Sequence, residues 1–113
     1  MAMRFEVLHE DDVFFFQLRT AEGDVILRSL DSPSKIMTQN EILHLRSSLQ
    51  DGSRLVPHTS ADGEHFVVVK DADGSVLAKS VRVATEQELQ ALREQVVAAA
   101  TAPIVDLTKR KAS

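Results

Sequence analysis

Two stretches of the chain share one pattern of hydrophobic and polar positions. The first runs from Phe15 to Ser29 (FFQLRTAEGDVILRS) and the second from Phe66 to Ser80 (FVVVKDADGSVLAKS), an offset of 51 residues. In both, a glycine separates two runs rich in β-branched and apolar residues, which is typical of a β-hairpin. Because apolar, basic, acidic and glycine positions match at one register, we interpret the two stretches as an internal duplication.

Further alternating runs predict strands around these hairpins. Residues 4–8 form an extended run, 9–12 a polar turn and 13–20 the strand that opens the first hairpin. Residues 54–59 precede the second hairpin, and Pro57, which has no N–H to donate, should lie at a sheet edge or bulge. A last short strand is expected at 104–107, after Pro103.

Helical periodicity follows each hairpin. In the first helix Ile42, Leu45 and Leu49 form one apolar stripe, and Ser32-Pro33 reads as the N-cap and first helical residue. Asp51-Gly52 predicts the end of this helix, with glycine in the left-handed conformation.

The second helix begins with a stronger signal. Thr85-Glu86-Gln87-Glu88 fits a capping box, and the buried stripe is expected at Leu89, Leu92 and Val96. The order β-β-β-α, then β-β-β-α-β, predicts an α+β fold with a mostly antiparallel sheet.

The two faces of the predicted sheet differ in character. Residues two apart share a face, so both helices should pack on the side that carries Phe14, Phe16, Leu18, Val67 and Val69. The opposite side then carries apolar and basic residues together, namely Phe15, Phe66, Val68, Ile26, Leu77, Gln17, Arg19, Arg28, Lys70 and Lys79.

Composition narrows the function classes. The chain has 113 residues, 43% of them hydrophobic and 27% charged, with a net charge of −4. That charge argues against general affinity for nucleic acid or anionic membranes. With no cysteine, disulfides, thiolate nucleophiles and cysteine-bound metals are excluded. No apolar run is long enough for a signal sequence or a membrane span, so we expect a cytoplasmic protein without membrane contact.

Catalytic and metal-binding patterns find no support in the sequence. The histidines lack the i, i+4 spacing of a helical metal site, although His58 and His65 could meet across a hairpin. The run Asp71-Ala72-Asp73-Gly74 resembles a calcium loop, but Arg82 stands where that loop needs a bidentate glutamate. No serine elbow or glycine-rich phosphate loop occurs. We therefore expect a protein that is not an enzyme and has no cofactor.

Several motifs resemble the tandem-repeat form of the YegP-like family, bacterial proteins of unknown function. They are the basic residue before an acidic-glycine turn, Ser34-Lys35 at the start of a helix, Asn40-Glu41-Ile42, and the ending from Pro103 to Thr108. The resemblance implies two β3-α-β repeats, about 3–52 and 53–108, in one domain spanning 1–108. They would form one sheet with exchanged terminal strands and both helices on one face.

The sequence also departs from the family pattern. Glu41 stands where the family usually has glycine, and the second helix reads Gln90-Ala91-Leu92 in place of the motif. The family implies no substrate, cofactor or catalytic residue.

The mixed sheet face is the predicted interaction surface. It comprises Phe15, Arg19, Arg28, Phe66, Lys70 and Lys79. We predict a non-catalytic binding or assembly module that uses this face for an unknown protein partner or a second copy. The alternative is a weak binder of single-stranded nucleic acid, because aromatic and basic residues on a sheet can stack bases and neutralise phosphates. Residues 109–113 read as a solvated basic tail, with Lys109-Arg110-Lys111 as a further weak contact for nucleic acid.

Overall fold

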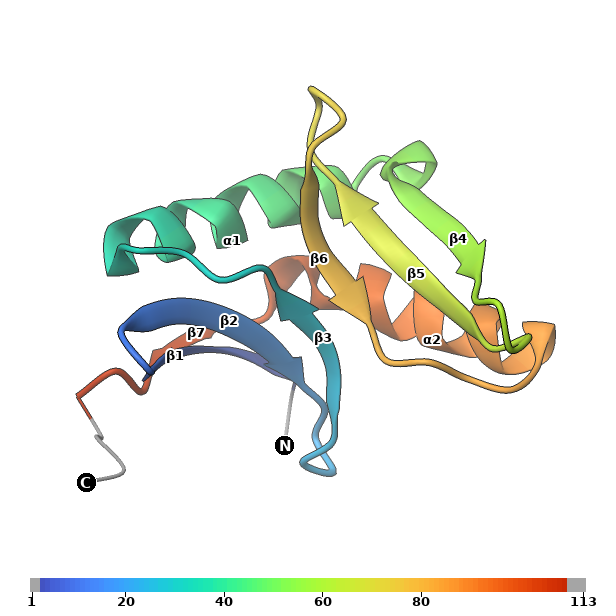
Figure 1. Ribbon diagram of the computed structural model, residues 1–113, viewed down its shortest axis with the longest axis horizontal. Coiled ribbons are helices and arrows are strands. Elements are labelled where there is room, and N and C mark those ends of the chain that lie inside the picture. The colour runs from blue at the N-terminus through green and yellow to red at the C-terminus, as the bar shows by residue number, and fades with distance from the viewer. Residues whose placement is uncertain (1–2, 110–113) are drawn as a thin grey trace.

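The computed structural model describes residues 3–109 and places them in one mixed seven-stranded sheet with two helices, an α+β fold (Figure 1). In chain order the elements are β1 (Arg4–Glu10), β2 (Val13–Arg19), β3 (Val25–Ser29), α1 (Lys35–Leu49), the 3₁₀ turn η1 (Gly52–Arg54), β4 (Leu55–Thr59), β5 (His65–Lys70), β6 (Val76–Ser80), α2 (Glu86–Ala98), the 3₁₀ turn η2 (Ala99–Thr101) and β7 (Ile104–Asp106).

The strands lie in the order β4-β5-β6-β3-β2-β1-β7. The two hairpins, β2–β3 and β5–β6, meet at an antiparallel β3–β6 pair, in which Arg28 lies opposite Lys79. All pairs are antiparallel except β1–β7. Strand β4 is an edge strand, so the predicted position of Pro57 is confirmed.

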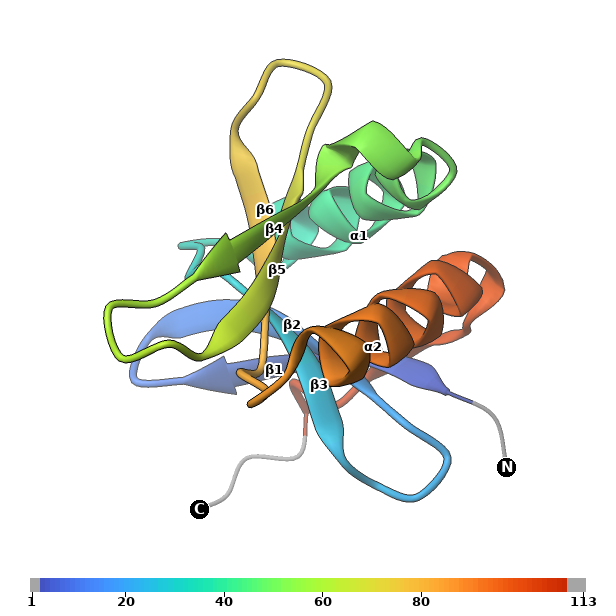
Figure 2. The same cartoon turned by 90° about the vertical axis from the view of Figure 1, so that its right-hand side faces the viewer.

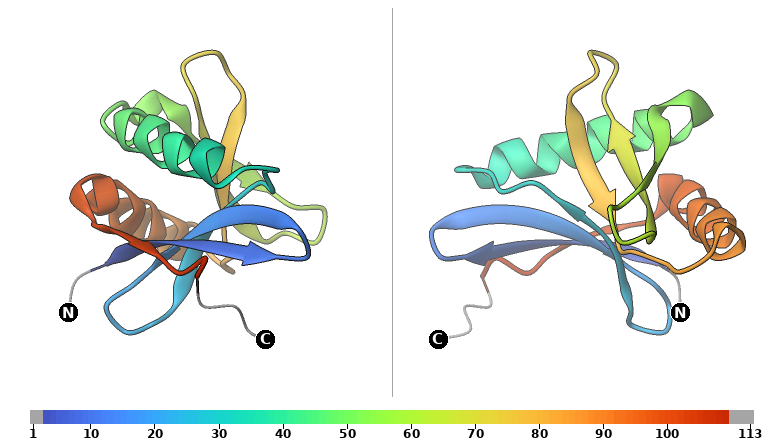
Figure 3. Two further views of the ribbon diagram at one scale, coloured as in Figure 1. Left: turned by 90° about the vertical axis from the view of Figure 1, so that its left-hand side faces the viewer. Right: turned by 45° about the vertical axis from the view of Figure 1, so that its right-hand side comes forward.

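Both helices cover the same side of this strongly twisted sheet (Figures 2 and 3). The predicted stripes of Ile42, Leu45 and Leu49 on α1, and of Leu92 and Val96 on α2, are buried in one core. Leu89 is partly buried against that core. The sheet contributes Phe5, Val7, Phe16, Leu18, Leu27, Leu55, Val67 and Val69. We call the side without helices the outer face.

Two residues predicted on the outer face belong to this core instead. Ile26 is 6% exposed and Leu77 is 4% exposed, and both pack in the core cluster. The reason is a bulge in each hairpin. Leu18 pairs with Leu27 but Arg19 pairs with Val25, which leaves Ile26 as the extra residue, and Leu77 is left over in the same way. A bulge breaks strict alternation and redirects the side chain.

The first helix begins two residues later than predicted. Its N-cap is Ser34, whose hydroxyl accepts a hydrogen bond from the Met37 amide. The predicted cap, Ser32, is held by two backbone hydrogen bonds to Phe14, 2.7 and 2.8 Å long. Because these bonds keep the chain extended, the helix starts only after Pro33.

Other element ends also differ in detail. Gly52 has no positive φ; it starts η1, and the Asp51 side chain accepts a hydrogen bond from the Ser53 amide there. Strand β1 continues to Glu10, so the tight turn is Asp11-Asp12, with φ of 49° and 65°. In α2 the predicted cap is confirmed, since Thr85 Oγ1 accepts from the Glu88 amide at 3.1 Å. The Glu88 carboxylate accepts from the Thr85 hydroxyl rather than from a backbone amide.

Candidate functional site

The six residues of the predicted interaction surface come from the central strands β2, β3, β5 and β6. Cross-strand pairing connects Glu6, Gln17, Arg28, Lys79, Val68 and Val56 in one row across the outer face. The two hairpins nevertheless present different surfaces, because matching side chains differ in their ion pairs and in how far neighbouring residues cover them.

The outer face of the first hairpin is closed by its own side chains. Phe15 is only 4% exposed, and the Arg28 guanidinium lies 4.0 Å from the centre of its ring. Arg28 also forms an exposed ion pair with Asp31 at 3.3 Å. Phe15 therefore presents no open ring at the predicted surface, since a cation from the neighbouring strand covers it.

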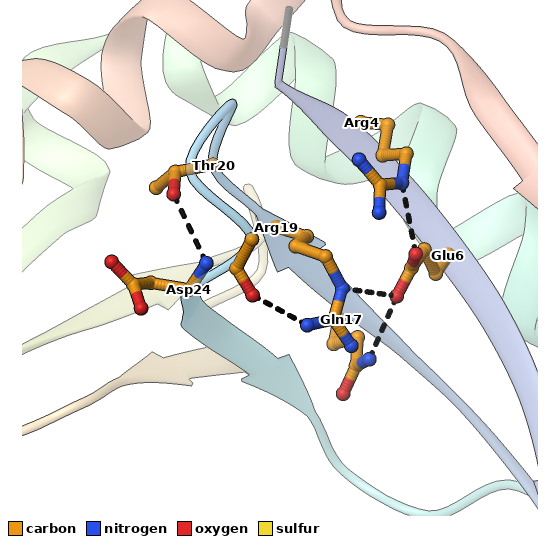
Figure 4. A network of polar contacts seen from close by, with 7 residues as sticks. Arg4, Glu6, Gln17, Arg19, Thr20 and Asp24 are labelled. Atoms are coloured by element: carbon orange, nitrogen blue, oxygen red, sulfur yellow. Dashed lines mark hydrogen bonds and ion pairs between the residues drawn. The ribbon is translucent and has the colours of Figure 1, made fainter. Parts of the chain in front are cut away.

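A buried carboxylate of β1 neutralises Arg19 of the first hairpin together with Arg4 of β1 (Figure 4). Glu6 is 4% exposed and accepts hydrogen bonds from Arg4 at 2.9 Å, Gln17 at 2.8 Å and Arg19 at 2.9 Å. Arg19 also donates to the Gly23 carbonyl at 2.5 Å. Burial by itself raises the pKa of Glu6, but the three donated hydrogen bonds outweigh burial and leave that pKa lowered. The carboxylate thus stays ionised and fixes Arg19.

The second hairpin has no equivalent of this network. Its pairing places Val56 opposite Val68, where the first hairpin has Glu6 opposite Gln17. Within residues 3–109, neither Lys70 nor Lys79 has an ion-pair partner. The two lysines therefore leave positive charge uncompensated at this end of the outer face.

A groove of about 270 Å³ opens beside these lysines. Phe66 is half-buried at its wall, with the His58 ring stacked on it at 5.4 Å and the Arg82 guanidinium 5.6 Å from its centre. We call this hollow the phenylalanine groove; it is lined by His58, Phe66, Val68, Lys70, Val76 and Lys79. The structure thus brings together three of the six predicted residues, Phe66, Lys70 and Lys79.

A second groove, of about 390 Å³, lies between α1 and the turn of the β5–β6 hairpin. We call it the helix groove; it is lined by Met37, Asn40, Glu41, His44, Asp71, Ser75, Val76 and Leu77. His44 Nδ1 lies 3.0 Å from Asp71 Oδ2, which joins the helix to the turn. The hydrogen bond from His44 lowers the pKa of Asp71, whereas burial raises the pKa of Glu41.

Sequence reasoning missed the helix groove and the role of Glu6. The alternation of Arg4 and Glu6 on one strand face was a usable signal for the charge network. The helix groove carries no local signal, because α1 and the β5–β6 turn approach each other only through the fold.

The remaining histidines, His9 and His65, each lie against a neighbouring side chain. His65 lies 3.1 Å from the Thr59 hydroxyl, while His9 stacks on Phe14 at 4.2 Å. Among residues 3–109 no three His, Asp or Glu side chains form a group able to hold a metal ion. No helix within that range has the length and apolar character needed to cross a membrane. Of the basic tail, Arg110 and Lys111 lie outside the described residues.

Comparison with known proteins gives structural relatives only. No family model and no curated protein matches the chain. A UPF0339 protein from Shewanella oneidensis, solved by NMR, is 20% identical over 99% of this chain and 97% of its own, with a TM-score of 0.92. The protein yegP from Escherichia coli, described as of unknown function, is 28% identical over 96% of this chain and 95% of its own, with a TM-score of 0.88.

These matches cover both hairpins, both helices and the chain between them. They confirm the resemblance to the YegP-like family that the motifs predicted.

Proposed function

We propose that this protein is a non-catalytic binding module that receives an anionic partner at the phenylalanine groove on its outer face. The observation that carries the proposal is that Lys70 and Lys79, which have no ion-pair partner within residues 3–109, line the same groove as the half-buried Phe66 ring. The first hairpin serves as an internal comparison. There Glu6 pairs with Arg19, the counterpart of Lys70, and the Arg28 guanidinium covers Phe15, the counterpart of Phe66.

Charge also bears on the choice between an anionic partner and a second copy of the chain. Arg28 and Lys79 lie opposite each other in the middle of the outer face, and both are exposed. Two copies docked through this face would bring like charges together, which is unfavourable. An anionic partner would meet complementary charge, even though the whole chain carries a net charge of −4.

Single-stranded nucleic acid is the second candidate, favoured by Phe66 in particular. A flat ring beside two cations matches the stacking and neutralisation that bind single strands. Phe66 is the less covered of the two predicted rings, since it is half-buried beside His58 and Arg82 whereas Phe15 is only 4% exposed. We therefore expect low affinity and strong dependence on salt.

The test is a titration with two polyanions, an oligothymidylate of about eight nucleotides and polyglutamate, at about 50 mM salt. We expect binding that shifts the NMR signals of Phe66, Lys70 and Lys79. Lys70→Gln with Lys79→Gln should weaken binding of both probes, and should lower the salt slope for the oligonucleotide by about 1.4, because each phosphate contact contributes about 0.7 in single strands. Arg93→Gln is the control, because this cation belongs to α2 and lines neither groove.

Ring substitutions separate the two candidates. Phe66→Leu keeps an apolar side chain but removes the stacking surface, so it should weaken oligonucleotide binding and leave polyglutamate binding unchanged. Phe15→Leu should change neither, because that ring is covered by Arg28. Absence of binding for both polyanions at low salt, or equal binding by the double lysine variant, would contradict the proposal.

We also infer that the two halves are β3-α-β repeats with an exchanged terminal strand. Two buried hydrogen bonds support this at the same offset of 51 residues. Ser29 Oγ accepts from the Phe16 amide at 2.9 Å, and Ser80 Oγ accepts from the Val67 amide at 2.8 Å. The isolated bridges Phe14–Ser32 and His65–Val83 repeat at that offset too. Strand β7 follows α2 in the chain but pairs with β1.

A further inference from the structure

The helix groove contains a carboxylate that the fold leaves without a partner. Glu41 is half-buried, and within residues 3–109 it makes no hydrogen bond and no ion pair. Its neighbours in the groove include apolar surface from Met37 and Leu77. A partly desolvated charge without a counter-ion is unfavourable unless something else supplies the opposite charge.

Comparison of the two helices shows how unusual this position is. Glu41 stands seven positions after the N-cap Ser34, and Leu92 stands seven positions after the N-cap Thr85. Leu92 is 4% exposed and packs in the core. At the position where α2 has a buried leucine, α1 therefore has a glutamate, and its side chain lines a groove.

The charges around the groove have one dominant sign. Asp71 of the β5–β6 turn and Glu41 and His44 of α1 line the groove, and Asp73 accepts a hydrogen bond from the amide of the lining residue Ser75. His44 bonds Asp71 at 3.0 Å and so is directed to that carboxylate. His44 is the basic group that acts on the Glu41 charge, and the other two basic residues of α1 are engaged elsewhere: Lys35 pairs with Asp106, and Arg46 donates to the Ala102 carbonyl.

From this geometry we propose that the helix groove binds an alkylammonium group, with Glu41 as its counter-ion and the apolar wall of Met37, Val76 and Leu77 against its hydrocarbon chain. The volume of about 390 Å³ accommodates a short alkyl chain. The same chemistry occurs in a free diamine and in a lysine side chain of a peptide. Val76 lines both this groove and the phenylalanine groove, whereas Glu41 lines only the helix groove.

The test uses 1,5-diaminopentane and N-acetyl-lysine methylamide as probes, with pentane-1,5-diol as the uncharged control. We expect the amines, but not the diol, to shift the NMR signals of Glu41, His44 and Leu77. Preference for the diamine would assign a free-amine ligand, and preference for the lysine derivative a peptide. Glu41→Gln should weaken amine binding by about tenfold or more, because a charge-assisted hydrogen bond is lost.

Two further variants make the result decisive. Glu41→Leu copies the residue of the second helix, so it should fold, unfold at a higher temperature and lose amine binding. Glu94→Gln, which removes an exposed carboxylate of α2, should bind amines like the unmodified chain. The proposal is overturned if the amines do not bind at millimolar concentration, if the diol binds equally well, or if Glu41→Leu keeps full affinity.

Discussion

At the scale of single residues, one buried carboxylate separates the two halves of the outer face. Glu6 accepts hydrogen bonds from three donors and is almost inaccessible to water, and Val56 takes its place in the second half. Without a carboxylate there, Lys70, the counterpart of Arg19, has no ion-pair partner within residues 3–109. A single exchange of charge for a hydrophobic residue thus changes a structural network into a candidate binding surface.

Glu6→Ala should destabilise the protein by about 2 kcal/mol, because it leaves two half-exposed arginines and Gln17 without their acceptor. Urea unfolding measures the change. Glu10→Ala, at an exposed position, should change stability by less than about 0.5 kcal/mol. Equal effects of the two substitutions would show that the network contributes nothing to folding.

The same carboxylate predicts a dependence of stability on pH. Its pKa in the folded protein is below the ordinary value of 4.5, so its stabilising contribution is complete above that pH and is lost as pH falls through the lowered pKa. Between pH 4.5 and more acidic conditions, the unmodified protein should lose more stability than Glu6→Gln, which has no charge to lose. Parallel curves of unfolding free energy against pH would contradict this.

At the scale of elements, pairing with the sheet and local capping together determine where α1 begins. The backbone bridge from Ser32 to Phe14 keeps that residue extended, and Ser34 becomes the cap. The two bulges act at the same scale, since they turn Ile26 and Leu77 into the core.

Ser34→Ala should therefore cost about 1 kcal/mol of unfolding free energy, the usual loss for an N-cap hydroxyl. Pro33→Ala, at the exposed residue just before the cap, is the control and should cost less. Thermal unfolding followed by circular dichroism compares the two. A larger loss at Pro33 than at Ser34 would mean that the helix is capped differently.

At the scale of the whole molecule, the β3–β6 pair and the shared core join the halves into one cooperative unit. Residues from both hairpins and both helices belong to a single cluster. A chain built in this way should unfold in one transition.

Leu18→Ala in β2 and Val69→Ala in β5 should each destabilise the protein by about 2–4 kcal/mol, because both side chains are fully buried. NMR signals from both halves should disappear at the same urea concentration in each variant. Loss of signals from the substituted half alone would show that the halves fold independently.

Alternation along the chain determined the strands, the hairpins, the buried stripes of both helices and the α+β class, because side-chain periodicity is a local property of the backbone. It also identified Phe66, Lys70 and Lys79 as neighbours on one face. Tertiary structure alone decided that Arg28 covers Phe15, that Glu6 neutralises Arg19, and that Glu41 borders a groove. The covering of a ring, the pairing of charges and the formation of a groove all depend on side chains from segments that are distant in the sequence. Periodicity within one segment therefore cannot predict them.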